Sequence, residues 1–162
     1  MRTASDAGAP VRLIETTVAV NDAPKKAMAG RVADALEGDL NGKVIGVLGL
    51  TFKPNTDDMR DAPSLDIVPA LQAMGATVQA YDPEGHEARQ MLRGVDFKDG
   101  PYEAVEGADA VVIITEWDQF RALDLDRMKL LMKSPNVVDL RNIYRPEDLR
   151  SRGFKYLSVG RA

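Results

Sequence analysis

The sequence predicts an α/β fold: a doubly wound, mostly parallel sheet with helices on both faces, preceded by an N-terminal helical segment. Two observations carry this prediction. Short runs of apolar residues, typical of strands buried on both faces, alternate with stretches whose apolar residues recur every three or four positions. Turn residues such as Asn41-Gly42 and Asp82-Pro83 separate them. This alternation favours parallel strands joined by helices.

The N-terminal helical segment is expected over residues 11–38. Pro24 divides it into two stretches, with Asp22 as a candidate cap for the second and Gly38 as its candidate end. The apolar residues that recur in the second stretch are Met28, Val32 and Leu36.

The strands of the sheet are expected at residues 44–50, 77–81, 110–114, 136–140 and 154–157. The helices between them are expected at residues 65–74, 84–92, 102–106, 125–132 and 146–150. Ser64 is a candidate cap for the first of these helices and Gly75 its candidate end, while Asp124 or Asp126 lies near the start of the fourth. Pro69, inside the first helix, should remove one backbone hydrogen bond and bend it.

The composition narrows the possible functions. The 162 residues suffice for one α/β domain with an appendage, and 21 basic against 25 acidic side chains argue against a broad nucleic-acid surface. No apolar run is long enough for a transmembrane helix, and residues 1–10 are not a signal peptide, so no membrane association and a cytoplasmic location are expected. Without cysteine, and with His86 as the single histidine, no metal site is expected.

Three loops follow the carboxyl ends of predicted strands, after Leu50, Ile114 and Leu140. Ligands of doubly wound sheets bind outside these ends, at the point where the strand order reverses. We therefore expect any ligand site to be built from these loops.

The first loop, residues 51–60, is longer and more charged than an ordinary strand–helix connection. It is not a dinucleotide fingerprint, because no G-x-G-x-x-G pattern opens the next helix. It offers Lys53 and Arg60 as cations for a diphosphate, and Phe52 as a flat apolar face for a base or sugar. A solvated charged turn explains the spacing equally well.

The other two loops carry weaker signals. Arg141 follows a buried strand, where a guanidinium could contact a phosphate or the edge of a ribose or base, but a structural pairing with Asp139 is the favoured alternative. Trp117 and Phe120 could line a pocket, although we favour a role in covering the core. Asp82 is expected to form an Asp-Pro turn rather than to hold a ribose.

The stretch GVLGLTFKPNTDDMR, residues 46–60, resembles the signature that opens the C-terminal domain of the UDP-glucose/GDP-mannose dehydrogenase family. Shorter segments agree in order and spacing: AYDP at 80–83, ADA at 108–110, TEW at 115–117, DLRN at 139–142 and YLSVGR at 156–161. The segment VAVN at 18–21, with KKAM at 25–28, is similar to the end of the family's long central helix. The resemblance covers the chain from Asp6 onward and is closest to the UDP-glucose 6-dehydrogenase branch.

The resemblance implies roles for the loop residues. Phe52 and Lys53 would contact the UDP-sugar, with Lys53 at the diphosphate, and Arg141 would contact the uridine part. Arg60 would reach towards NAD held by the family's N-terminal domain.

The resemblance also implies a domain organisation. Residues 1–41 would be a remnant of the central dimerisation helix region, and residues 42–162 a UDP-sugar-binding domain with a Rossmann-like fold. The expected partners are UDP-glucose or UDP, the missing N-terminal NAD-binding domain, and a second copy of the chain that forms a homodimer through the helical region.

The family's activity implies what this chain lacks. Its enzymes oxidise UDP-glucose to UDP-glucuronate with two NAD and a cysteine nucleophile. Because this chain has neither a cysteine nor the glycine fingerprint, we expect no catalytic residues, no cofactor bound by this domain alone, and no activity by itself. The same domain of a UDP-N-acetylmannosamine or GDP-mannose dehydrogenase, and a non-enzymatic α/β structural domain, are the alternatives.

Overall fold

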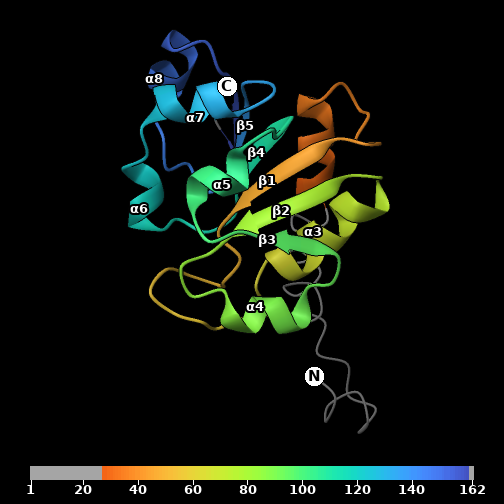
Figure 1. Ribbon diagram of the computed structural model, residues 1–162. Coiled ribbons are helices and arrows are strands. Elements are labelled where there is room, and N and C mark those ends of the chain that lie inside the picture. Colours follow the sequence, from red (N-terminus) through yellow and green to blue (C-terminus); the bar gives the residue numbers. More distant parts are fainter. Residues whose placement is uncertain (1–26, 161–162) are drawn as a thin grey trace, which may run out of the picture.

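A computed structural model describes residues 27–160 and contains a six-stranded sheet (Figure 1). Its strands are β1 (Val44–Leu48), β2 (Thr77–Tyr81), β3 (Val95–Phe97), β4 (Ala110–Ile113), β5 (Asn136–Asp139) and β6 (Lys155–Ser158). They lie in the order β3-β2-β1-β4-β5-β6, and every neighbouring pair is parallel. The predicted doubly wound α/β fold is therefore confirmed.

Helices cover both faces of the sheet. They are α3 (Ser64–Ala73), α4 (His86–Met91), α5 (Pro101–Val105), α6 (Asp118–Arg121), α7 (Leu125–Leu131) and α8 (Pro146–Ser151), together with an unlabelled helix over residues 27–35. Residues 27–35, α3 and α4 contribute to the core on one face, whereas α5 to α8 contribute to the core on the other.

The two central strands, β1 and β4, divide their side chains between these cores. Ile45 and Val47 of β1 enter the core beneath α3, while Leu48 enters the core beneath α5. Val112 and Val111 of β4 alternate in the same way. Such strands are apolar on both faces, which explains why the sequence shows continuous apolar runs rather than alternation.

Two elements were not predicted, β3 and α6. Strand β3 has three residues at the edge of the sheet and includes the exposed Asp96, and α6 is a single turn of four residues. Elements this short show no resolvable periodicity, and neighbouring elements stabilise them instead.

The helix ends test the predicted caps. Gly75, with φ of +92°, ends α3 as predicted. Of the two aspartates predicted near the start of α7, Asp124 is the one that caps it, by accepting hydrogen bonds from two backbone N–H groups. The prediction for Ser64 is wrong: its hydroxyl donates to the carbonyl of Leu50 and makes no cap hydrogen bond. Helix α3 continues through Pro69, and the bend expected there stays a prediction.

The second half of the predicted N-terminal helix is present over residues 27–35 and ends before Gly38, which has φ of +87°. Its first half lies outside the described residues, as do Asp22, Pro24 and the Arg161 of the closing motif. Within residues 27–160, no helix is long and apolar enough to cross a bilayer.

The glycines of β1 serve close packing. A Cβ at Gly46 would collide with the carbonyl of Ala104, so its absence lets α5 pack directly on β1. Gly49 has φ of +87°, and a Cβ there would lie 2.6 Å from the Cβ of Thr115. Both glycines are therefore explained by contacts inside the protein.

Candidate functional site

The strand order reverses between β1 and β4, which places a topological switch point at their carboxyl ends. From β1 the chain proceeds outwards through β2 and β3, and from β4 outwards through β5 and β6. The loop over residues 49–63 and the loop over residues 114–117 leave this point side by side. Crevices at such positions are the usual ligand sites of doubly wound sheets.

Hydrogen bonds join these two loops. The Thr115 hydroxyl donates to the carbonyl of Thr51 over 2.6 Å, and the backbone N–H of Ile114 donates to the carbonyl of Leu48 over 3.0 Å. Gly49 allows Thr115 to approach this closely. The two loops thus form one connected surface at the switch point.

Asp82, at the carboxyl end of β2, lies beneath this surface with 9% of its area exposed. Its Oδ2 accepts hydrogen bonds from the backbone N–H of Leu50 and Thr51, the Thr51 hydroxyl and the Trp117 indole. Its Oδ1 accepts from the backbone N–H of Glu84, which confirms the predicted turn. Sequence reasoning found the turn but missed the four longer-range hydrogen bonds.

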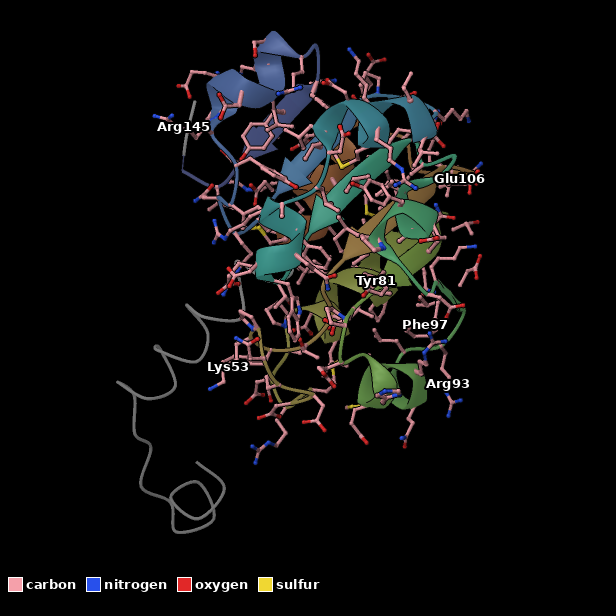
Figure 2. All side chains as sticks on the ribbon, turned by 60° about the vertical axis from the view of Figure 1, so that its left-hand side comes forward. Lys53, Tyr81, Arg93, Phe97, Glu106 and Arg145 are labelled. Atoms are coloured by element: carbon pink, nitrogen blue, oxygen red, sulfur yellow. The ribbon has the colours of Figure 1, made fainter. Side chains whose placement is uncertain are left out.

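Phe52 and Lys53 extend from the loop after β1 into solvent. The Phe52 side chain is 46% exposed, although its backbone N–H donates to the carbonyl of Asp58 over 2.8 Å. Lys53 is exposed, and Figure 2 shows its side chain at the periphery of the molecule. Within residues 27–160, no acidic side chain forms an ion pair with its ammonium group. Its charge is therefore available to a ligand.

Arg60, on the same loop, is ion-paired with Asp58. The guanidinium donates to both carboxylate oxygens, over 3.0 and 2.8 Å, while its side chain stays 89% exposed. The hydrogen bonds from Arg60 lower the pKa of Asp58 to about 2. Both residues line a hollow of about 420 Å³ between this loop and α4, on the side where Figure 1 shows the loop passing α4.

Arg141 follows β5 and forms a bidentate ion pair with Glu116 of the loop after β4, over 2.5 and 2.8 Å. The predicted alternative, a side-chain pairing with Asp139, is wrong, because Asp139 accepts only the backbone N–H of Arg141. The other oxygen of this buried carboxylate accepts from the backbone N–H of Tyr144 and the Tyr156 hydroxyl. Hydrogen bonding from Arg141 lowers the pKa of Glu116.

Trp117 and Phe120 cover the core, as favoured from the sequence. They are 7% and 0% exposed and belong to the apolar cluster beneath α5 to α8. A separate apolar hollow of about 170 Å³ lies beside Arg141. Its lining residues are Met28, Pro63, Ile67, Ile114, Leu140, Arg141 and Val159.

The predicted binding residues therefore lie on two loops at the carboxyl ends of the strands, which we call the carboxyl edge of the sheet. Phe52, Lys53 and Arg60 share the loop after β1, whereas Arg141 comes from the loop after β5. In the described part of the chain no hydrogen bond or ion pair joins Arg141 to these three, and Glu116 on the intervening loop holds it instead. Within the same residues, no cluster of three or more acidic or histidine side chains could hold a metal ion.

Comparison with protein families identifies the domain. A family model for the UDP-binding domain of UDP-glucose/GDP-mannose dehydrogenases matches residues 46–146, more than half of the chain. The chain belongs to the UDP-glucose/GDP-mannose dehydrogenase family. The matched UDP-binding domain runs from β1 to the start of α8 and contains all four predicted binding residues.

Individual relatives agree with this family. The chain is 59% identical, over 99% of its length, to the UDP-glucose 6-dehydrogenase of Rhizobium meliloti, and 37% identical over 99% of its length to the UDP-glucose 6-dehydrogenase TuaD of Bacillus subtilis. It covers only 37% and 35% of those proteins. The chain thus spans little more than a third of the length of the curated relatives it matches.

Solved structures show the same fold. A UDP-D-ManNAc dehydrogenase from Pyrococcus horikoshii matches with a TM-score of 0.80 at 30% identity, over 98% of this chain and 36% of that one. A UDP-glucose dehydrogenase from Pyrobaculum islandicum matches with a TM-score of 0.73 at 27% identity, over 98% of this chain and 34% of that one. The sheet and its helices are therefore those of the family's dehydrogenases.

Proposed function

We propose that this chain binds the uridine diphosphate part of a UDP-sugar at the carboxyl edge of its sheet, as the UDP-binding domain of a UDP-glucose 6-dehydrogenase. The observation that carries the proposal is an exposed lysine, Lys53, that forms no ion pair within residues 27–160 and lies beside an exposed aromatic residue, Phe52, at the switch point of a family member's UDP-binding domain. A diphosphate needs a cation, and a sugar or base needs a flat apolar face.

The ion pairs of the three candidate cations suggest which of them contacts the diphosphate. Arg60 is neutralised by Asp58 and Arg141 by Glu116, whereas Lys53 pairs with no acidic side chain among residues 27–160. A cation without an ion-pair partner contributes more to binding a doubly charged diphosphate than one already held by a carboxylate. We therefore assign Lys53 to the diphosphate.

Arg141 is better suited to the uridine part. Its contact with Glu116 uses Nε and Nη2 and leaves the Nη1 hydrogens free to donate. A guanidinium neutralised in this way still offers directional hydrogen bonds to carbonyl or hydroxyl oxygens. The apolar hollow beside Arg141 supplies a surface of the kind that a base or ribose requires.

The proposal for the whole protein is oxidation of UDP-glucose to UDP-glucuronate with NAD, as the family resemblance implies. This chain's own glycines do not fit a dinucleotide: Ala104 and Thr115 fill the space beside Gly46 and Gly49. That packing supports a cofactor held by another domain, with the exposed Arg60 reaching towards it. The chain alone would then be inactive.

A second candidate is the same domain of a UDP-N-acetylmannosamine dehydrogenase, favoured by the likeness to the Pyrococcus horikoshii structure. Both candidates share the nucleotide and differ in the sugar, so both assign the same role to Lys53 and Arg141. The domain boundary at residue 41, the homodimer through the helical region and the cytoplasmic location stay predictions.

Titration calorimetry with UDP-glucose, UDP and GDP tests the proposal. We expect saturable binding that prefers UDP to GDP, with a dissociation constant in the upper micromolar to millimolar range, or roughly −4 to −6 kcal/mol, because half a cleft offers few contacts. Lys53→Ala and Arg141→Ala should each weaken it. Absence of binding at several millimolar UDP, or a preference for GDP, would contradict the proposal.

A further inference from the structure

We propose that Asp82 is the positioning residue of the nucleotide site: its carboxylate fixes the loop that carries Phe52 and Lys53 and couples that loop to Trp117. This inference rests on the proposed function for its ligand, but its structural part can be tested without one. Asp82 directly follows the neighbouring strand, β2, and within residues 27–160 it forms no hydrogen bond with the Phe52 or Lys53 side chain.

The carboxylate is held between two loops. Oδ2 accepts from the backbone N–H of Leu50 over 2.6 Å and of Thr51 over 3.0 Å, and from the Thr51 hydroxyl over 3.0 Å. The Trp117 indole donates to the same oxygen over 3.2 Å from the loop after β4. One oxygen atom therefore ties together both loops of the switch point.

These contacts require a carboxylate rather than an amide. Oδ1 accepts from the backbone N–H of Glu84 over 2.9 Å, so both oxygens of Asp82 face only donors. An asparagine would turn its NH₂ group towards a donor on one side or the other. Within residues 27–160 no lysine or arginine forms an ion pair with Asp82, so these hydrogen bonds alone compensate its charge.

These contacts matter for binding because they hold the two residues just before Phe52 and Lys53. Leu50 and Thr51 immediately precede Phe52 and Lys53, and the Thr51 hydroxyl also lies 3.3 Å from the carbonyl of Lys53. Fixing these two residues fixes where the following aromatic ring and ammonium group leave the surface. A flexible loop would have to be ordered by the ligand, which weakens binding.

Trp117 supplies a direct readout, because it is the single tryptophan of the chain. Its indole N–H gives one side-chain NMR signal, and this N–H donates a hydrogen bond to Oδ2 of Asp82. Nucleotide binding at the loop after β1 should therefore shift this signal, although the ring is buried and only 7% exposed.

The test compares Asp82→Asn with Asp109→Asn in the full chain. Asp109 is a matched control: it is 3% exposed, and its oxygens accept from the backbone N–H of Val44 and pair with Lys133, both over 3.0 Å. It lies at the opposite ends of β1 and β4, away from the proposed site.

We expect Asp82→Asn to accelerate hydrogen exchange at the amides of Leu50 and Thr51 by about tenfold or more, to shift the indole signal, and to weaken UDP binding about tenfold. Asp109→Asn should change none of these. Unchanged exchange and indole signal in folded Asp82→Asn, or equal loss of UDP affinity in both variants, would overturn the inference. If the wild-type chain binds no UDP, the proposed function fails, and the exchange measurement still decides the role of Asp82.

A smaller change covers the case in which Asp82→Asn does not fold. Thr51→Val removes only the hydroxyl that donates to Asp82, and Thr51→Ser restores it. We expect faster exchange at residue 51 and about threefold weaker UDP binding in the valine variant, with both effects reversed by serine. Wild-type behaviour of Thr51→Val in both measurements would overturn the inference.

Discussion

A buried carboxylate lies near each end of the central strands β1 and β4, and the two carboxylates have different partners. At the amino edge, Asp109 is paired with Lys133. Burial alone would raise the pKa of Asp109, but hydrogen bonds from the Val44 N–H and from Lys133 outweigh it and hold the pKa below its usual value. At the carboxyl edge, Asp82 accepts only neutral N–H and O–H donors, and Lys53, on the loop that Asp82 holds, extends into solvent.

This difference shows how one strand pair can serve both the fold and a ligand. At the amino edge, Asp109 and Lys133 neutralise each other within the fold. At the carboxyl edge, the anion is satisfied by the backbone and an indole, so the cation on the loop stays available. The carboxyl edge is also where doubly wound sheets bind their ligands.

The largest loss of stability is expected from a substitution that prevents the close approach of the loops after β1 and β4. Gly49→Ala places a Cβ against Thr115 and forces a side chain into φ of +87°, so we expect a loss of about 4 kcal/mol in the free energy of unfolding. Gly107, at the amino edge, also has a positive φ but has open space around it. Gly107→Ala should cost only about 1 kcal/mol.

Urea unfolding of both variants measures this contrast. Equal losses would mean that backbone conformation alone decides the effect and that the contact between the loops after β1 and β4 contributes nothing.

An intermediate effect should appear in ligand binding. Lys53→Ala should weaken UDP binding about tenfold and reduce its dependence on salt concentration, because the charge that is removed forms no ion pair within residues 27–160. Lys43→Ala, at the amino edge, should leave both unchanged. Calorimetric titrations between low and high ionic strength measure the two dependences, and a salt dependence that survives Lys53→Ala would place the diphosphate elsewhere.

The smallest effect concerns the exposed pair at the far end of the loop. In Arg60→Gln the pKa of Asp58 should return from about 2 towards its usual value of 3.8. Because the folded pKa is the lower one, the stabilisation by the pair is present above about pH 4 and disappears as the pH falls towards 2. NMR titration of the Asp58 carboxyl carbon measures this, and an unchanged midpoint would show that Arg60 is not the cause.

The elements that depend on local sequence pattern were predicted from the sequence. The side-chain partners that depend on contacts between distant residues were not. The central strands, an aspartate near the start of α7 and the end of α3 at Gly75 follow from apolar runs and from residue types with strong backbone preferences. Glu116 as the partner of Arg141 could not be inferred, because 25 residues and a strand crossover separate them. Its neighbour Trp117 showed only its apolar character in the sequence, not its indole hydrogen bond to Asp82.

The candidate site was predicted in its exposed parts and missed in its buried support. Phe52, Lys53 and Arg60 stand out because a loop this long and charged is unusual between a strand and a helix. Asp82 was recognised only as half of an Asp-Pro turn, since a single carboxylate carries no sign of the loops that will pack around it. Ser64 was misassigned for the same reason, because its acceptor on Leu50 is 14 residues away.

The most direct test of the account is NMR mapping of UDP on the isotope-labelled chain. We expect amide signals of residues 50–60, 115–117 and 140–142 to shift in a saturable way, while those of residues 41–43, 75–77 and 107–109 at the amino edge stay unchanged. Shifts centred on the amino edge, or no shifts at several millimolar UDP, would contradict a uridine diphosphate site at the carboxyl edge of the sheet.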